Sequence, residues 1–269
     1  MRGLSRASLA EVEERFNAIA GSADLGRLAE ELDSVADLLD REHGLRRAVS
    51  DPARPADQKT QVVRGLLQGK ISDAGLETVA AAVAAKWSRP GDLADALERL
   101  SISASAAEAE SLRRIDEVED ELFRFGRIVA ANPALRRALS DPSVPEEGKQ
   151  ELLRGLLDGK VAPTTLRLVT QAVVHPRGRS LEGALEEIGQ LVAEQRQRLV
   201  AVVRSAVELT EEQKRRLSAW LRDSYGRDVH LNTEVDPRVL GGFSVRIGDE
   251  VIDSTILGRI EDVRRRLAG

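Results

Sequence analysis

Apolar residues recur every three or four positions through the first two thirds of the chain, the spacing that places them on one side of an α-helix. One such stripe runs from Leu25 to Leu39, and a second runs from Ile115 to Val129. After each stripe stand residues that suit helix starts and ends, namely Pro55 and Gly69 in the first case and Pro145 and Gly159 in the second. The pattern predicts helices of about 8 to 20 residues with short connections, packed as bundles.

The helical part of the sequence repeats itself after 90 residues. Leu45–Lys70 reads LRRAVSDPARPADQKTQVVRGLLQGK, and Leu135–Lys160 reads LRRALSDPSVPEEGKQELLRGLLDGK. Each copy has the size of a domain rather than of a short solenoid module. We therefore expect two tandem helical bundles, over residues 1–100 and 101–195. Residues 101–111 (SISASAAEAES) are either a linker or the first helix of the second copy, and their Ala content favours the helix.

The last third of the chain changes to the period of β-strands. Apolar residues alternate in segments that predict four strands, over 199–207, 229–235, 243–247 and 251–252. After the first strand, Thr210 and Gln213 have the spacing of a capping box, which predicts the start of a helix. One face of that helix carries Leu217, Trp220 and Leu221.

Turn and cap residues divide the C-terminal segment. Gly241 and Gly242 indicate either a close approach of the backbone to a ligand or a turn that needs a positive φ, and we favour the turn. Gly248 and Asp249 predict another turn, and Asp253 or the next residue caps a last amphipathic helix. The element order is then β-α-β-β-β-α over residues 196–269. The fold class expected for the whole chain is α+β and mostly α, with two tandem helical bundles followed by this small α/β domain.

Composition narrows the possible functions. No cysteine is present, which excludes disulfides, thiolate metal sites and cysteine nucleophiles. The net charge is −5, and acidic and basic residues are mixed along the chain, so no nucleic-acid-binding face is indicated. No apolar run reaches the roughly 18 residues that a membrane helix needs, and the N-terminus lacks the apolar region of a signal peptide. We expect a soluble, cytoplasmic chain that reaches a membrane only through a partner.

Two patterns that could carry chemistry do not fit it. The segment Gly65-x-x-x-Gly69-Lys70 and its copy at Gly155 have one residue too few between the glycines for a phosphate loop, and no Ser or Thr follows the Lys. They are interpreted as helix ends. The histidines do not have the spacing of metal ligands on one helix, and they are His43, His175 and His230.

The remaining charged clusters are also interpreted structurally. Arg177-Gly178-Arg179 is either an anion or partner site or a surface loop that helps to cap a helix, and we favour the loop. A group of carboxylates is interpreted as a solvated helix face, and it consists of Glu117, Glu119, Asp120 and Glu121. We predict no catalytic residue, no metal site and no cofactor, which favours a binding protein over an enzyme.

The C-terminal third resembles a known family. Val235–Ala268 reads VDPRVLGGFSVRIGDEVIDSTILGRIEDVRRRLA, which looks like the end of the δ subunit of F-type ATP synthases, the relative of the mitochondrial oligomycin-sensitivity-conferring protein. LTEEQKRRL (Leu209–Leu217) and the second helical copy also fit that family, so the resemblance covers residues 101–269. Ser254-Thr255 stands where Gly-Ser is common, which is a minor departure.

The first helical copy departs from the common family form, which has one helical domain. The doubled domain, with ELFRFGRI (Glu121–Ile128) and HPRGRS (His175–Ser180), resembles the actinobacterial version, in which δ can be fused behind a membrane-anchored stalk subunit. Because this chain starts at Met1 without a membrane helix, the free-standing form is expected.

The resemblance implies a peripheral-stalk (stator) subunit with no catalytic step. Its helical domain would grip the N-terminal helices of the α subunits, and its C-terminal domain would bind the b subunits. Together they would resist rotor torque during proton-driven ATP synthesis at the cytoplasmic face of the cell membrane. By resemblance, an α-subunit helix lies in a groove between the first and fifth helices of a bundle. In the second copy this implies a groove lined by Ala104, Ala107, Leu166 and Val169.

Several functions stay open on the residues alone. The first copy holds a second α-subunit helix or only braces the stalk. The whole chain could instead be a generic cytoplasmic helical adaptor, or an RNA-binding protein that uses its α/β domain. Balanced charge and the lack of an aromatic pair for base stacking disfavour RNA. Salt dependence discriminates between these functions, because RNA binding weakens steeply with salt.

Overall fold

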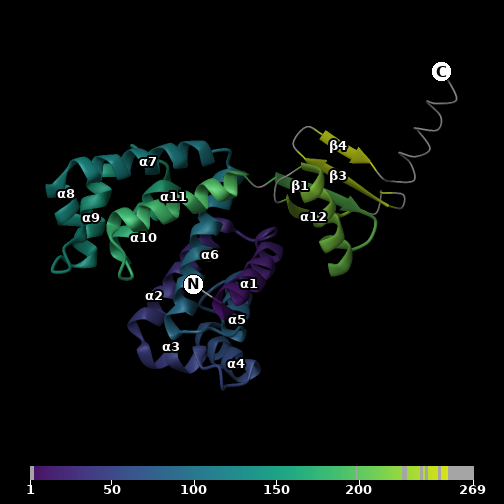
Figure 1. Ribbon diagram of the computed structural model, residues 1–269, viewed down its shortest axis with the longest axis horizontal. Coiled ribbons are helices and arrows are strands. Elements are labelled where there is room, and N and C mark those ends of the chain that lie inside the picture. The colour runs from purple at the N-terminus through teal and green to yellow at the C-terminus, as the bar shows by residue number, and fades with distance from the viewer. Residues whose placement is uncertain are drawn as a thin grey trace. The chain divides into compact units, whose positions relative to one another are not determined.

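A computed structural model describes residues 3–197, 199–225, 229–236, 239, 242–247 and 250–253 (Figure 1). The chain divides into two compact units, Met1–Gln195 and Arg196–Gly269. The first unit is helical, and its elements are α1 (Leu4–Ala20), α2 (Leu25–Arg41), α3 (His43–Ser50), α4 (Ala56–Leu67), α5 (Asp73–Ala84), α6 (Pro90–Ser111), α7 (Ile115–Ala131), α8 (Pro133–Ser140), α9 (Glu146–Leu157), α10 (Pro163–Val174) and α11 (Leu181–Gln197).

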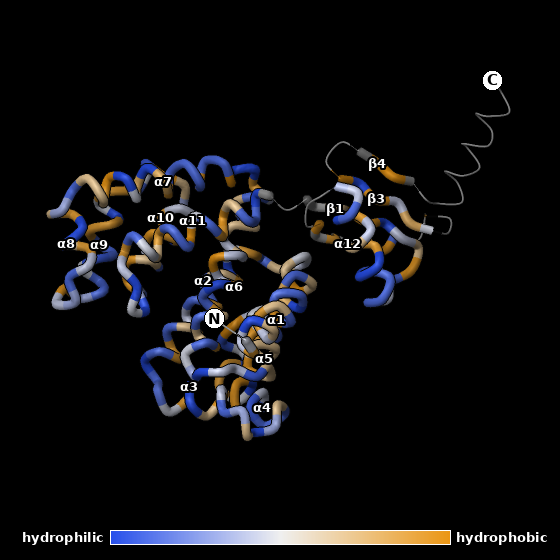
Figure 2. Tube along the Cα trace, in the orientation of Figure 1, coloured by the Kyte–Doolittle hydropathy of each residue, from blue (hydrophilic) through white to orange (hydrophobic). Residues whose placement is uncertain are grey.

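The internal repeat is also a repeat of structure. Helices α2 to α5 begin and end 90 residues before α7 to α10, so each predicted helix of one copy has its counterpart in the other. The glycines expected to end helices do so, because α4 and α9 stop two residues before Gly69 and Gly159, whose φ angles are 76° and 69°. Figure 2 shows the alternation of apolar and polar residues along these helices.

One helix is shared by the two hydrophobic cores of the helical unit. Residues 101–111 are helical, as expected, but they continue α6 without a break, so the predicted boundary between residues 100 and 101 falls inside a helix. Leu97, Leu100 and Ala104 pack in the first core, whereas Ile102 and Ala106 pack in the second. Because both cores contain residues of α6, this helix joins the two bundles directly, without a flexible linker.

In each copy, a glutamate carboxylate accepts a hydrogen bond from a backbone N–H just before the same helix begins. Glu121 is 8% exposed, and one of its carboxylate oxygens accepts a hydrogen bond from the backbone N–H of Ala162, at 2.9 Å, just before α10. In the first copy, Glu31 accepts a hydrogen bond from the backbone N–H of Ser72, at 2.8 Å, just before α5. The interpretation of Glu121 as part of a solvated face is therefore wrong, because this carboxylate satisfies a free N–H near a helix start.

The second unit is a small sheet with one described helix. Its elements are β1 (Leu199–Ser205), α12 (Glu211–Tyr225), β2 (Val229–Val235), β3 (Phe243–Ile247) and β4 (Glu250–Asp253). The strand order is β2-β1-β3-β4, with β1 and β2 parallel and the other neighbours antiparallel. The helix α12 connects the parallel pair, as such pairs require. The fold class is therefore the expected one, α+β and mostly α.

Local predictions in the second unit have mixed outcomes. The capping box is confirmed, because the backbone N–H of Thr210 donates to Gln213 Oε1 at 2.8 Å and the N–H of Gln213 donates to Thr210 Oγ1 at 3.2 Å. The first strand ends at Ser205 rather than at residue 207, because Ser205 Oγ donates to the carbonyl of Val207 in a turn. The predicted last helix lies outside the described residues. None of the helices in the described ranges is long and apolar enough to cross a membrane.

Candidate partner-binding surfaces

The four residues predicted to line a helix-binding groove do not form one surface. Ala104 is fully buried in the first core, and Val169 is fully buried in the second. Leu166 is half-buried against the second core, and Ala107 is half-buried on α6. A partner cannot contact Ala104 or Val169 in this arrangement.

The physical reason is that α2 of the first copy lies along α6. Ser101 Oγ, one turn before Ala104, donates a hydrogen bond at 2.8 Å to the backbone carbonyl of Ala29 on α2. Further along, Gly26 of α2 faces the carboxylate of Glu108 on α6, and a Cβ atom at Gly26 would lie 2.4 Å from Glu108 Oε1, so a larger residue would displace this side chain. Part of the groove predicted for the second copy is therefore filled by a helix of the same chain.

Polar contacts join the two bundles beside this packing. On α2, Asp33 Oδ1 accepts a hydrogen bond from Gln171 Nε2 at 2.7 Å, and Asp37 Oδ1 lies 3.2 Å from His175 Nδ1. Asp33 and Asp37 are four residues apart on α2, and their partners are four residues apart at the end of α10. The two contacts therefore lie about one helical turn apart along neighbouring segments. Burial raises the pKa of Asp33, although the nearby His175 and Arg177 act in the opposite direction.

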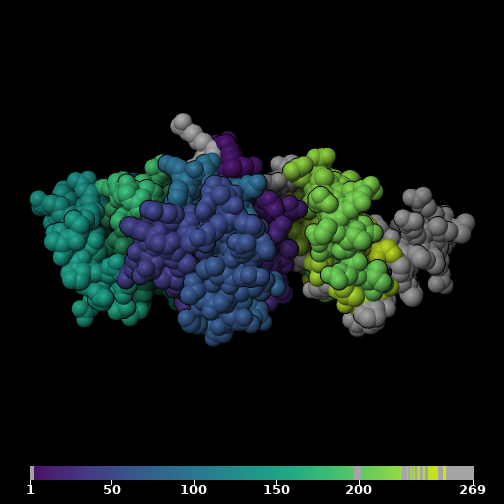
Figure 3. All heavy atoms as spheres, turned by 90° about the horizontal axis from the view of Figure 1, so that it is seen from below, coloured from purple at the N-terminus to yellow at the C-terminus, as the bar shows by residue number. Residues whose placement is uncertain are grey.

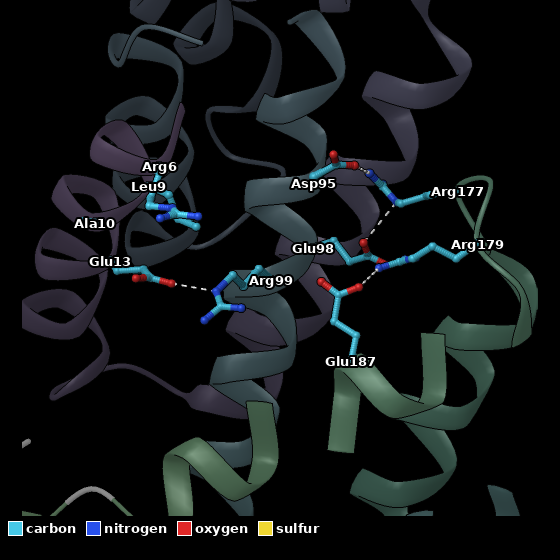
Figure 4. A pocket seen from close by; sticks show the side chains of 10 residues that line it. All are labelled: Arg6, Leu9, Ala10, Glu13, Asp95, Glu98, Arg99, Arg177, Arg179 and Glu187. Atoms are coloured by element: carbon cyan, nitrogen blue, oxygen red, sulfur yellow. Dashed lines mark hydrogen bonds and ion pairs between the residues drawn. The ribbon is translucent and has the colours of Figure 1, made fainter. Parts of the chain in front are cut away.

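Arg177 lies at the centre of a partly buried ion-pair cluster (Figure 4). Its side chain is 7% exposed, and its guanidinium nitrogens lie 3.0 Å from Asp40, 3.7 Å from Asp95 and 3.7 Å from Glu98. The φ angle of Arg177 is 48°, a left-handed backbone conformation that is uncommon for a residue other than glycine. The segment is a loop in which Pro176 and Gly178 are exposed, as the favoured interpretation expects, but the buried Arg177 side chain also connects this loop to α2 and α6.

Arg179 extends the same cluster. It contacts Glu98 and lies 2.7 Å from Glu187 of α11. Burial raises the pKa of Asp95 and of Glu98, and the two arginines act against that rise. These carboxylates line a polar cleft of about 480 Å³ whose walls also carry arginines, so the charges compensate one another. The arrangement is suited to holding helices together, and no group of metal-binding side chains is found among the described residues.

The second unit has an apolar cleft between α12 and the sheet. Leu217 and Leu221 are buried on α12, whereas Trp220 is 50% exposed and lines this cleft together with Leu217. The lining residues are Leu209, Gln213, Arg216, Leu217, Trp220, Phe243 and Ile252. An exposed Trp beside buried leucines is a common anchor for a partner protein. In the sequence, the only sign of this anchor is that Trp220 stands next to Leu221.

The predicted turn motif is described only in part. Gly242 is exposed and has a φ of 77°, in agreement with the turn that we favoured. Asp253 ends β4 and pairs with Ser244 of β3. Gly241, Gly248 and Asp249 lie outside the described residues.

Comparisons with known proteins agree with the sequence resemblance. The family model of the ATP synthase delta (OSCP) subunit matches residues 101–267. A protein of Thermobifida fusca named ATP synthase subunit delta is 53% identical over 269 residues, which is the full length of both chains. A protein of the same name from Streptomyces coelicolor is 49% identical over all of this chain and 98% of the relative. The similarity to these relatives includes the first helical copy, which the family model does not cover.

Proposed function

Because the chain belongs to the ATP synthase delta (OSCP) subunit family, we propose that it acts in the peripheral stalk of an F-type ATP synthase. It is a subunit with no catalytic activity of its own. In the proposal, it links the α subunits of the catalytic head to the membrane-anchored b subunits at the cytoplasmic face of the cell membrane. It thereby keeps the head from turning with the rotor during ATP synthesis. The full-length similarity to delta subunits carries this proposal.

The construction of the helical unit suits a part that must resist torque. The two bundles share α6, and α2 packs along that helix with glycine at the close approach. The buried Arg177 adds ion pairs to two helices at once. A connection built in this way transmits force with little bending, because packed cores and buried ion pairs do not deform gradually. The partner of this unit is proposed to be the N-terminal helix of the α subunit.

The apolar cleft of the second unit is proposed as the site for a b-subunit helix. Trp220 supplies a large, half-exposed anchor, and Phe243 and Ile252 of the sheet form the opposite wall. Arg216 and Gln213 supply polar groups at the rim. An amphipathic helix could place its apolar side against such a cleft and its polar side in water.

Replacing Trp220 with Glu is expected to weaken binding of the soluble part of the b subunit by at least about tenfold, because an anchor in an apolar cleft typically dominates the binding energy. Calorimetry with the full chain measures this. Val207→Glu is the matched control, since Val207 is 70% exposed in the same unit and does not line the cleft. Equal affinities of the two variants for b would contradict the assignment of the cleft.

A further inference from the structure

The sheet of the second unit has one apolar face that α12 covers only in part. Val203, Val245 and Ile252 lie in one row across β1, β3 and β4, because paired residues of neighbouring strands point to the same side of a sheet. Val203 and Val245 are buried, whereas Ile252 is half-buried. Among the strands, α12 packs most closely on β2, so the apolar cleft of about 380 Å³ stays open over β3 and β4. Figure 3 shows α12, in green, and parts of the strands, in yellow, together at the surface.

The opposite face of the sheet has a different character. Side chains alternate between the two faces along a strand, so Arg204 of β1 and Arg246 of β3 lie on that opposite face, and both are exposed. Val251 pairs with Arg246 there, so its apolar side chain stands beside a charge. A helix that packed its apolar side on this face would bury charged groups at a cost in free energy. An apolar helix face therefore fits the cleft on the α12 side of the sheet.

A single helix covers about half of this sheet. A helix with its side chains is about 10 Å wide and neighbouring strands lie about 4.8 Å apart, so one helix covers about two strands. The sheet has four strands, and α12 is the one helix of this unit among the described residues. Within the described part, the two-layer arrangement is therefore incomplete over β3 and β4.

The chain leaves the described sheet beside this cleft. β4 ends at Asp253, and Ile252 before it lines the cleft. The sequence predicts an amphipathic helix directly after Asp253. Its apolar stripe consists of Ile256, Ile260, Val263 and Leu267. A helix over residues 256–267 would be about 18 Å long, against about 22 Å for the 15 residues of α12, so it is long enough to cover the cleft.

We propose that residues 254–267 fold back as a helix over this cleft in the free chain, and that a partner helix must displace them to bind there. This rests on the proposed function, in which the partner is a helix of the b subunit. A segment that is tethered beside its site acts at a high local concentration, so it lowers the apparent affinity of the partner. It also shields the apolar cleft, including Trp220, before the chain joins its complex.

The test releases the segment by a substitution in the full chain. Ile260→Asp places a carboxylate in the apolar stripe and is expected to free the cleft. Binding of the soluble part of the b subunit, measured by calorimetry, should then tighten about tenfold, as it would if the cleft were open in about one free chain in ten. Arg265→Asp is the matched control, because it places the same side chain on the opposite side of the predicted helix, and it should bind like wild type.

The fluorescence of Trp220 gives a second readout that needs no partner. Trp87 is 3% exposed, so quenching by acrylamide reports mainly on Trp220. Quenching is expected to be stronger in Ile260→Asp than in wild type and in Arg265→Asp. It should not depend on the concentration of the chain, because the segment covers the cleft of its own molecule. Far-UV circular dichroism checks that each variant is folded.

The outcomes separate this inference from the proposed function. Equal quenching in wild type and Ile260→Asp would overturn the inference, while b binding that Trp220→Glu weakens would still support the proposed function. Weaker b binding in Ile260→Asp would also overturn it, because the segment would then hold the partner rather than exclude it. Quenching that falls as the chain concentration rises would make the segment of a second copy the occupant and contradict the fold-back. If no variant bound b while Ile260→Asp still increased quenching, the b-subunit assignment would fail and the segment would remain the occupant of the cleft.

Discussion

Replacing Val169 with Asp is expected to destabilise the second helical bundle strongly. The Val169 side chain is fully buried on α10 among the apolar residues of the second core. An aspartate there would place an unpaired carboxylate in an apolar environment, at a cost of about 3–5 kcal/mol. This is a large share of the stability of about 5–15 kcal/mol that is typical of a domain. Urea unfolding followed by far-UV circular dichroism measures the loss.

Leu166→Asp is the matched control on the same helix. Leu166 is half-buried, so an aspartate at this position can reach water, and the expected loss is no more than about 1–2 kcal/mol. If Val169→Asp were as stable as the control, the placement of α10 in the core would be wrong. This result also bears on binding assays, because loss of binding in Val169→Asp would report a disturbed core rather than a lost surface contact.

Replacing Arg177 with Ala is expected to destabilise the helical unit by about 3–5 kcal/mol near neutral pH. The substitution leaves Asp40, Asp95 and Glu98 close together without their central cation. Glu98 also contacts Arg179, and Asp40 also lies 3.2 Å from Arg46, so the variant keeps two compensating charges. Thermal and urea unfolding of the full chain measure the effect, and Arg177→Lys, which keeps the charge, is expected to lose less.

The same variant has a characteristic pH dependence. Burial already raises the pKa of Asp95 and Glu98, and removing Arg177 removes a cation that lowers both. Carboxyl groups whose pKa is higher in the folded state bind more protons when folded, so the stability that they contribute is gained as the pH falls and lost as it rises. The deficit of Arg177→Ala relative to wild type should therefore be larger at about pH 8 than at about pH 5. A deficit that grows on acidification would contradict the cluster.

The helical boundaries could be predicted from the sequence because their determinants are local. Apolar spacing sets the stripes, and Gly69 and Gly159 end helices through their own backbone conformation. The capping box of Thr210 and Gln213 spans four residues and is equally local. Such features depend little on what packs around them.

The candidate groove could not be predicted from the sequence because it depends on how the copies pack. In an isolated second bundle Ala104 would line an open groove, but α2 of the first copy covers that side of α6. Arg177 shows the same limit, because its counterpart Trp87 is a buried core residue and the two bundles meet only in three dimensions. In the sequence, the sign of this difference is that an arginine in the second copy stands where the first copy has a core tryptophan.

The central claim is that this chain attaches the catalytic head of an ATP synthase to the b subunits. The most direct test is to tag the chain in its native host, solubilise the membranes in mild detergent and measure what co-purifies. The account predicts recovery of the α, β and b subunits in a fixed ratio to the tagged chain. Recovery of an intact synthase that lacks the chain, with the tagged protein alone in a separate fraction, would contradict the account.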